Sequence, residues 1–250
     1  MTIMKQTQPL IIGHRGAAGE APENTLVSFL LAVEQGAHAL ELDVHLSADG
    51  EMIVCHDETV TRTTNGTGAI AHMTVEQLKQ LDAGARFNPR FAGEPLPLLA
   101  EVFAAIPNSI MINVEVKCSY SDRLLERFTE LLQEYDRLSS VVVSSFDHKI
   151  LVKLKQALPE LRIGLLYTAN FASHRLMAEQ TGVEVYSLHP YYKLLDAEDI
   201  QDAVAHGLEV YPFTINAEAE LQQAVEAGVT GIITDYPERL RRLLATHAKL

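Results

Sequence analysis

The chain has 250 residues, 47% of them hydrophobic, which is enough to bury one large core. This length is typical of a single β/α barrel, so we expect one domain over residues 1–250. A formal net charge of −13 argues against nucleic acid and anionic membranes as partners, because both need a broad basic face. An anionic small-molecule substrate would therefore need a local cationic pocket.

Nothing in the sequence predicts a membrane span or an exported protein. The apolar stretches are far shorter than the roughly 20 residues that a membrane helix needs, and residues 1–9 lack the hydrophobic segment of a signal peptide. Cys55 and Cys118 form neither a CxxC motif nor a disulfide framework. We therefore expect a cytoplasmic protein, and a homo-oligomer is left open.

Strand-like apolar runs alternate with helical patterns along the chain. The runs lie at residues 10–14, 39–44, 111–117, 141–146, 162–167, 185–189, 209–215 and 231–234. The helical patterns lie at residues 25–34, 98–105, 122–135, 148–157, 173–180, 197–205, 217–227 and 237–248. Eight such pairs predict an α/β fold, the TIM (β/α)8 barrel. An open doubly wound sheet is the competitor, but no GxGxxG or GxxxxGK[ST] loop follows a strand.

One long segment, at about residues 46–97, separates the second strand from its helix. It contains a further strand-like run at 52–55 and a turn rich in Gly, Asn and Thr at 63–68. In a barrel, an insertion between a strand and its helix sits over the catalytic rim. We therefore expect a small cap here that contributes to substrate binding.

Carboxylates follow a strand pattern at two places. Glu41 and Asp43 alternate along the second strand, so both point to one face while the aliphatic residues between them point to the other. The same parity on the third strand places Glu115 and Lys117 inward. Three carboxylates that converge from adjacent strands repel one another unless a divalent cation compensates their charge.

The donor set of this cluster contains only oxygen. It has neither a Cys cluster nor a His-x-His pair, which favours Mg²⁺ or Ca²⁺ over structural Zn²⁺ and leaves Mn²⁺ open. Taken alone, Glu41 and Asp43 would be better explained as part of a solvated strand. Glu115 and Lys117 would be better explained as a surface ion pair. Their place on adjacent, outwardly apolar strands favours ligands instead, so the sequence predicts one divalent cation held by Glu41, Asp43 and Glu115.

Two histidines, His14 and His56, each end a hydrophobic run. Histidine has the unperturbed pKa best suited to proton transfer near neutrality. A lone histidine is more often structural, but two that flank a carboxylate cluster favour an acid/base pair. The other eight histidines are outside this catalytic set, although His45 shares the parity of Asp43 and His189 ends the sixth strand, where it could face the substrate.

Two cations lie beside these groups in the sequence. Arg15 and Lys117 match the charge of non-bridging phosphate oxygens. Gly16 permits close approach of the backbone. Together with the histidines and the predicted cation site, they indicate metal-assisted cleavage of a phosphodiester.

Longer motifs containing these residues resemble the glycerophosphodiester phosphodiesterase family, in its short bacterial, cytoplasmic form. The motifs run from residue 14 to residue 235, nearly the full chain. In chain order they are His14-Arg15-Gly16, Ala21-Pro22-Glu23-Asn24-Thr25, Glu41-Leu42-Asp43-Val44, Asp49-Gly50, His56-Asp57, Arg62-Thr63-Thr64-Asn65-Gly66, Glu94-Pro95-Leu96-Pro97-Leu98, Glu115-Val116-Lys117, Ser144-Ser145-Phe146 and Thr234-Asp235.

The resemblance implies a TIM barrel with a small insertion and the hydrolysis of glycerophosphodiesters to glycerol 3-phosphate and a free alcohol. Substrates such as glycerophosphocholine or glycerophosphoethanolamine follow from it. By this resemblance, the family's metal ligands match Glu41, Asp43 and Glu115. Its acid/base pair matches His14 and His56, and its phosphate contacts match Arg15 and Lys117.

Two departures from the family pattern bear on the alcohol side. The chain has Ser47-Ala48-Asp49-Gly50 where the family often has Thr-Lys-Asp-Gly, and Phe213-Thr214-Ile215-Asn216 where it has Trp-Thr-Val-Asn. The missing Trp ring removes an apolar wall and a cation–π partner for choline. The sequence offers no evident headgroup cage, and Phe213 and the Tyr191-Tyr192 pair have no assigned place. We therefore expect broad headgroup tolerance, with specificity coming from the glycerol side.

Three alternative functions fit the sequence less well. A phospholipid-cleaving lyase of the sphingomyelinase D type shares the barrel, histidines and carboxylates, but it would be expected in a secreted, disulfide-bearing chain. A non-catalytic binding module is disfavoured by the complete set of charged residues. A metal-dependent amidohydrolase would need His-x-His on the first strand, and position 16 is glycine.

The predicted mechanism uses no protein nucleophile, because the chain has no activated Ser or Cys motif. The substrate's own glycerol 2-hydroxyl is a candidate first nucleophile, with a cyclic phosphate hydrolysed afterwards. The sequence leaves open which histidine is the acid, which ion is physiological and which alcohol is preferred.

Overall fold

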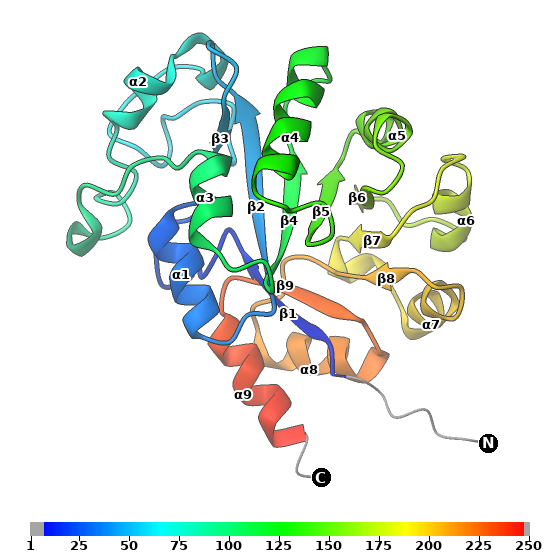
Figure 1. Ribbon diagram of the computed structural model, residues 1–250. Helices are drawn as coiled ribbons and strands as arrows, with labels where there is room; N and C mark the ends of the chain where they lie inside the picture. Colours follow the sequence, from blue (N-terminus) through cyan, green and yellow to red (C-terminus); the bar gives the residue numbers. More distant parts are fainter. Residues whose placement is uncertain (1–7, 248–250) are drawn as a thin grey trace.

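A parallel barrel forms the centre of the computed structural model, which describes residues 8–247 (Figure 1). The strands lie in the order β8-β7-β6-β5-β4-β2-β1-β9, and each strand runs parallel to its neighbours in this order. The ends of this order approach each other, since the amide of Thr230 donates to Val210 O at 3.2 Å and that of Ile233 to Pro212 O at 3.1 Å. The predicted TIM barrel is confirmed. Its strands are β1 Leu10–His14, β2 Ala39–Leu46, β4 Met111–Val116, β5 Val141–Ser145, β6 Arg162–Tyr167, β7 Ser187–Pro190, β8 Glu209–Val210 and β9 Gly231–Thr234.

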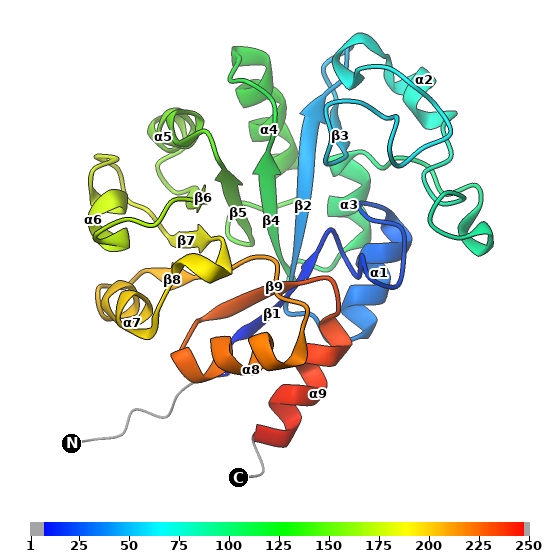
Figure 2. The same ribbon diagram turned by 180° about the vertical axis from the view of Figure 1, so that it is seen from behind.

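Helices surround the barrel, as the views from opposite sides show (Figures 1 and 2). Side chains of Thr25, Ser121, Asp147 and Ser173 cap the N-termini of four of them. Each predicted helix is observed within one residue of its expected ends, and residue 248 lies outside the described residues. The helices are α1 Leu26–Glu34, α3 Leu99–Ala105, α4 Asp122–Glu134, α5 His148–Ala157, α6 His174–Glu179, α7 Ala197–Ala205, α8 Glu218–Ala227 and α9 Pro237–His247.

Side chains sort by strand parity. Leu40, Leu42 and Val44 on β2 are buried in the main core between the barrel and its helices. Ala39, on the opposite face of β2, packs with Ile12, Tyr211 and Ile233 in a small cluster that fills the barrel interior. The inward-facing polar residues further along β2 therefore lie above an apolar floor.

The eighth strand is shorter than predicted. Residues 209–215 were expected to form it, but β8 ends at Val210. Pro212 has no N–H to donate to a ladder. Beyond it the chain remains extended, and Phe213 and Thr214 line the barrel mouth instead of continuing a regular strand.

The insertion after β2 folds on itself. Its strand β3, Met52–Val54, pairs antiparallel with β2, and it also contains the short helices η1 Ile70–His72, α2 Val75–Lys79 and η2 Pro89–Phe91. Figure 1 shows it projecting beyond the carboxyl end of β2. A separate core cluster holds it together, made of Ile53, Cys55, Val60, Ile70, Leu78, Ala83 and Leu96.

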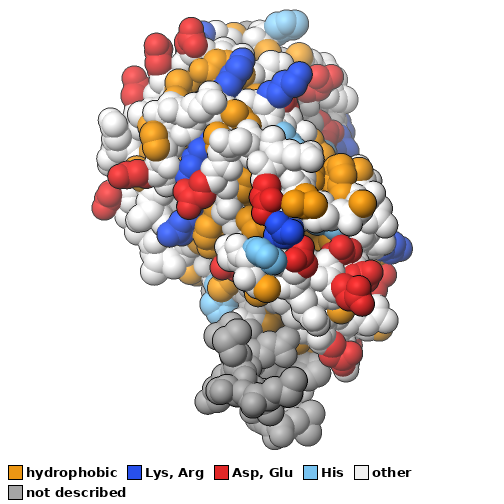
Figure 3. All heavy atoms as spheres, turned by 90° about the vertical axis from the view of Figure 1, so that its right-hand side faces the viewer, with side chains coloured by type: hydrophobic (Ala, Val, Ile, Leu, Met, Phe, Trp, Pro, Cys, Tyr) orange, Lys and Arg blue, Asp and Glu red, His pale blue; other side chains and the backbone are white. Residues whose placement is uncertain are grey.

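Charged side chains of both signs lie on the surface. On the face seen in Figure 3, Lys and Arg side chains are scattered among acidic ones and form no continuous basic patch. Within residues 8–247, none of the helices is both long and apolar enough to cross a bilayer.

Candidate active site

A cavity of about 410 Å³ opens at the carboxyl ends of the barrel strands. This is the rim at which a TIM barrel places its active site. Charged residues gather on one part of its lining and aromatic residues on another. The lining consists of His14, Arg15, Glu41, His56, Asn113, Glu115, Lys117, Phe146, Leu166, Tyr191, Tyr192, Phe213, Thr214 and Ile233.

Three carboxylates converge at this cavity as the strand parity predicts. Asp43 on β2 lies directly opposite Glu115 on β4, and Glu41 precedes it on the same face of β2. One oxygen of each of the three lies within 4.8 Å of the others. Glu41 is 4% exposed, Asp43 1% and Glu115 8%. Water therefore screens the repulsion between their carboxylates poorly.

This repulsion raises the pKa values of two of the three carboxyl groups. Burial and the charge of Asp43 raise the pKa of Glu115 to about 7, and burial and the neighbouring carboxylates raise the pKa of Glu41 well above its ordinary value. Burial opposes ionisation of Asp43 too, but Arg15 and Lys117 hold its pKa below the ordinary value. A buried set of oxygen donors that repel one another has the chemistry of a site for a hard divalent cation.

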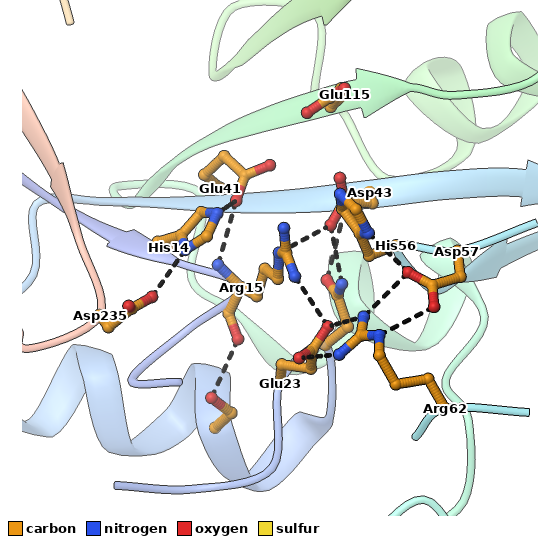
Figure 4. A network of polar contacts seen from close by, with 12 residues as sticks. His14, Arg15, Glu23, Glu41, Asp43, His56, Asp57, Arg62, Glu115 and Asp235 are labelled. Carbon is orange, nitrogen blue, oxygen red and sulfur yellow. Dashed lines mark hydrogen bonds and ion pairs between the residues drawn. The ribbon is translucent and has the colours of Figure 1, made fainter. Parts of the chain in front are cut away.

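His14 is oriented by a carboxylate on the last strand's loop. Its Nδ1 lies 2.6 Å from Asp235 Oδ1, and its Nε2 lies 3.9 Å from Glu41 Oε2. Asn216 Nδ2 donates to the second oxygen of Asp235 at 2.6 Å. Burial opposes ionisation of Asp235, but the hydrogen bonds from His14 and Asn216 lower its pKa. His14 Nε2 therefore points to the carboxylate cluster while Nδ1 is anchored (Figure 4).

His56 is anchored in the same manner from the insertion. Its Nδ1 lies 2.7 Å from Asp57 Oδ1, and its carbonyl oxygen lies 3.1 Å from His45 Nε2. Hydrogen bonds from Arg62, and then from His56, hold the pKa of Asp57 far below its ordinary value. Burial lowers the pKa of His56, so its imidazole is largely neutral near pH 7.

An alternating chain of charges runs from Asp57 to the carboxylate cluster (Figure 4). Arg62 donates hydrogen bonds to Asp57 at 2.8 Å and to Glu23 Oε2 at 2.7 Å. Arg15 donates to Glu23 Oε1 at 2.9 Å. Arg15 Nε then lies 3.3 Å from Asp43 Oδ2. On the far side of Asp43, Lys117 Nζ lies 3.6 Å from Oδ1 and donates to Glu115 at 2.8 Å. Each cation therefore bridges two anions.

The turn after β1 aims Arg15 into this network. Arg15 has φ 51°, and its amide donates to Glu41 Oε2 at 3.0 Å while its carbonyl accepts from Ser28 Oγ at 3.0 Å. Gly16 follows with φ 90°, where a Cβ would collide with Ser28. Only glycine fits this close approach to α1 without strain, which agrees with the role expected for Gly16.

Aromatic residues form the opposite wall. Phe146, Tyr191, Tyr192 and Phe213 all line the cavity, with ring centroids 6.0 Å apart for Phe146 and Phe213 and 5.2 Å apart for the two tyrosines. The departure at Phe213 therefore leaves an aromatic wall in place. The other departure lies outside the lining, where Asp49 accepts from the amide of Val75 at the start of α2.

The structure brings all seven predicted site residues together. Among insertion residues, only His56 lines the cavity, so the insertion reaches the site from one side, and its role in substrate binding stays a prediction. His189 does not line the cavity. It is fully buried in the barrel with Nε2 2.8 Å from Ser187 Oγ, and burial lowers its pKa to about 3.

Four supporting residues had no role in the sequence-based prediction, namely Glu23, Asp57, Arg62 and Asp235. All four lie inside motifs that carried the family resemblance. Their contacts join segments up to 221 residues apart in the chain, as with His14 and Asp235. Only the fold reveals which charges meet.

The comparisons with known proteins agree with this geometry. Residues 14–239 match the model of the glycerophosphoryl diester phosphodiesterase family. The chain belongs to this family. It is 40% identical, over 94% of its length and 97% of the relative's, to a glycerophosphodiester phosphodiesterase of Caldanaerobacter subterraneus. A Bacillus subtilis enzyme of the same name is 32% identical over 94% of this chain and 86% of its own length.

Solved structures of the family share the fold. An Oleispira antarctica phosphodiesterase, in complex with the product sn-glycerol-3-phosphate, has a TM-score of 0.87 and 32% identity, covering 95% of this chain and 97% of its own. A glycerophosphodiester phosphodiesterase from Agrobacterium tumefaciens has a TM-score of 0.81 and 30% identity, covering 94% and 99%. As a family member, the chain is a phosphoric diester hydrolase.

Asp235 provides a test of how His14 is held. Asp235→Asn keeps the shape of the side chain but places an amide beside His14 Nδ1, which favours the other imidazole tautomer. We expect kcat to fall by roughly 10²- to 10⁴-fold with little change in KM. Asp202→Asn, which removes an exposed carboxylate beside His206 on α7, serves as the control and should leave kcat unchanged. Equal kcat in both variants would contradict the role of Asp235.

Proposed function

We propose that the cavity hydrolyses glycerophosphodiesters to glycerol 3-phosphate and an alcohol, with His14 and His56 as the acid/base pair. The observation that carries the proposal is the pairing of each Nδ1 with its own carboxylate, Asp235 or Asp57, on either side of the carboxylate cluster. Each histidine is thereby fixed with Nε2 free for proton transfer. Arg15 and Lys117 offer cationic groups to the non-bridging phosphate oxygens.

A divalent cation fits the remaining chemistry. Glu41, Asp43 and Glu115 would hold it, since their oxygens meet within 4.8 Å and belong to buried residues. The donors suit Mg²⁺, Ca²⁺ or Mn²⁺. Such an ion, when bound, would polarise a phosphoryl oxygen and balance developing negative charge.

Removing the cation tests this assignment. EDTA should abolish activity, and adding back Mg²⁺, Ca²⁺ or Mn²⁺ should restore it. Glu41→Gln and Glu115→Gln keep shape but remove charge, so each should lose most turnover, whereas Glu130→Gln on the exposed face of α4 should not. Near-normal turnover in the first two variants, with EDTA-resistant wild type, would overturn the metal site.

The proposed chemistry begins on the substrate itself. One histidine takes the proton of the glycerol 2-hydroxyl, whose oxygen attacks phosphorus. The bond from phosphorus to the alcohol oxygen breaks, and the other histidine gives that oxygen a proton. Water then opens the cyclic phosphate by cleaving the bond to O2, which leaves glycerol 3-phosphate. An internal hydroxyl has a high effective concentration compared with water.

Each step of this route can be checked. His14→Ala and His56→Ala should each lower kcat by roughly 10²- to 10⁴-fold, the usual loss for an acid/base group. His206→Ala, an exposed change just after α7, is the control. A substrate with hydrogen in place of the glycerol 2-hydroxyl should not turn over. Full activity on it would rule out the cyclic route and leave attack by water.

The aromatic wall sets how selective the alcohol side can be. A cation–π contact contributes about 0.5–2 kcal/mol, so the wall can favour choline over ethanolamine by at most about 30-fold. We expect kcat/KM for glycerophosphocholine and glycerophosphoethanolamine to differ by no more than this, and Phe213→Leu to narrow the gap. A difference of several orders of magnitude would contradict headgroup tolerance.

The alternatives have less support. A lyase of the sphingomyelinase D type would leave a cyclic phosphate as its final product, which chromatography of the products would reveal. A binding module would bind glycerol 3-phosphate without turnover. Cytoplasmic location and homo-oligomerisation stay predictions.

A further inference from the structure

One polar side chain of the cavity lacks the partner that its burial demands. Asn113, two residues before Glu115 on β4, lines the cavity and is only 1% exposed. Neither its Oδ1 nor its Nδ2 has a hydrogen-bond partner among residues 8–247. A buried polar group without a partner destabilises the fold, because it has lost its hydrogen bonds to water. Both ends of the amide are affected, so the conclusion does not depend on which end is oxygen.

Each charged side chain of the same lining has at least one partner, as Arg15 has in Glu23. His14 and His56 bind Asp235 and Asp57. Glu41 accepts from the amide of Arg15, and Glu115 accepts from Lys117. Asn113 differs in that neither of its functional atoms is used by the protein.

The chemistry of an amide restricts what it can bind. Nδ2 only donates and Oδ1 only accepts. A phosphate dianion has only acceptor oxygens, and a metal cation would leave the Nδ2 donor unused. A hydroxyl both donates and accepts, so glycerol can use both atoms at once, through one hydroxyl or through two vicinal ones.

We propose that Asn113 is a specificity-determining residue that binds the glycerol hydroxyls of the substrate, donating from Nδ2 and accepting at Oδ1. The inference rests on the proposed function and assigns the glycerol group to the β4 side of the cavity, near Glu41, which lies opposite Asn113 in register. The aromatic wall then faces the alcohol. Sites built to hydrogen-bond a hydroxyl reject analogues that lack it, because their buried polar groups are left unpaired.

Inhibition separates glycerol recognition from phosphate recognition. Asn113→Leu has a similar volume and no polar group, so we expect Ki for glycerol 3-phosphate to rise roughly 10- to 100-fold. Ki for inorganic phosphate, which lacks the glycerol, should stay within about threefold. The same variant should have a lower kcat/KM for glycerophosphocholine. Its kcat/KM for bis(p-nitrophenyl) phosphate, which has no glycerol group, should not fall.

Two measurements keep the result interpretable. Ser144→Ala is the matched control, since Ser144 Oγ is equally buried and unpartnered among the described residues but its residue does not line the cavity. It should leave the ratio of the two Ki values unchanged. The melting temperature of Asn113→Leu should equal or exceed that of the wild type, because an apolar residue replaces an unsatisfied amide. If it unfolds, Asn113→Ala takes its place.

The outcomes are distinct. Equal losses for glycerol 3-phosphate and phosphate, or no loss for either, would overturn the role of Asn113. A wild type that neither hydrolyses glycerophosphocholine nor binds glycerol 3-phosphate would instead overturn the proposed function.

Discussion

Electrostatic repulsion among Glu41, Asp43 and Glu115 is the constraint on which the site depends. Strand parity brings these three carboxylates within 4.8 Å of one another at a place where little water screens them. Alternating charges compensate part of this, because Arg15 and Lys117 both contact Asp43. They do not compensate all of it, since the pKa values of Glu41 and Glu115 remain raised. A divalent cation bound there, as proposed, would compensate the remainder, and a phosphodiester would then meet positive charge in a protein of net charge −13.

The same network positions the histidines. Asp57 holds His56 and is bound by Arg62, which also binds Glu23, the partner of Arg15. The ion pairs therefore connect the insertion to the β1 turn through Arg62, Glu23 and Arg15. Strand ends supply the carboxylates and His14, and the insertion supplies His56.

Much of this could be predicted from the sequence because the signals are local. Alternation along β2 predicted which residues face inward, and the helical patterns predicted the helix ends to within one residue. Predictions failed where the outcome depends on tertiary contacts. The apolar run after Val210 reads as a strand, but the regular strand ends at Val210, and Phe213 lines the cavity. The sequence left open whether His189 faces the substrate, and in the fold it fills the space beside Gly164, which no local pattern indicates. Asp235 is 221 residues from His14, so their contact has no local sequence signal.

Thermal unfolding with and without a cation tests the account most directly, because it reports on charge repulsion independently of turnover. At a cation concentration about 100 times Kd, the wild-type melting temperature should rise by about 5 to 10 °C above its value in EDTA. Glu115→Gln in EDTA should be at least as stable as the wild type in EDTA, since one of three repelling charges is gone, and should respond weakly to the cation. A wild type that melts at the same temperature in both conditions, or a Glu115→Gln variant that responds as fully as the wild type, would contradict the account.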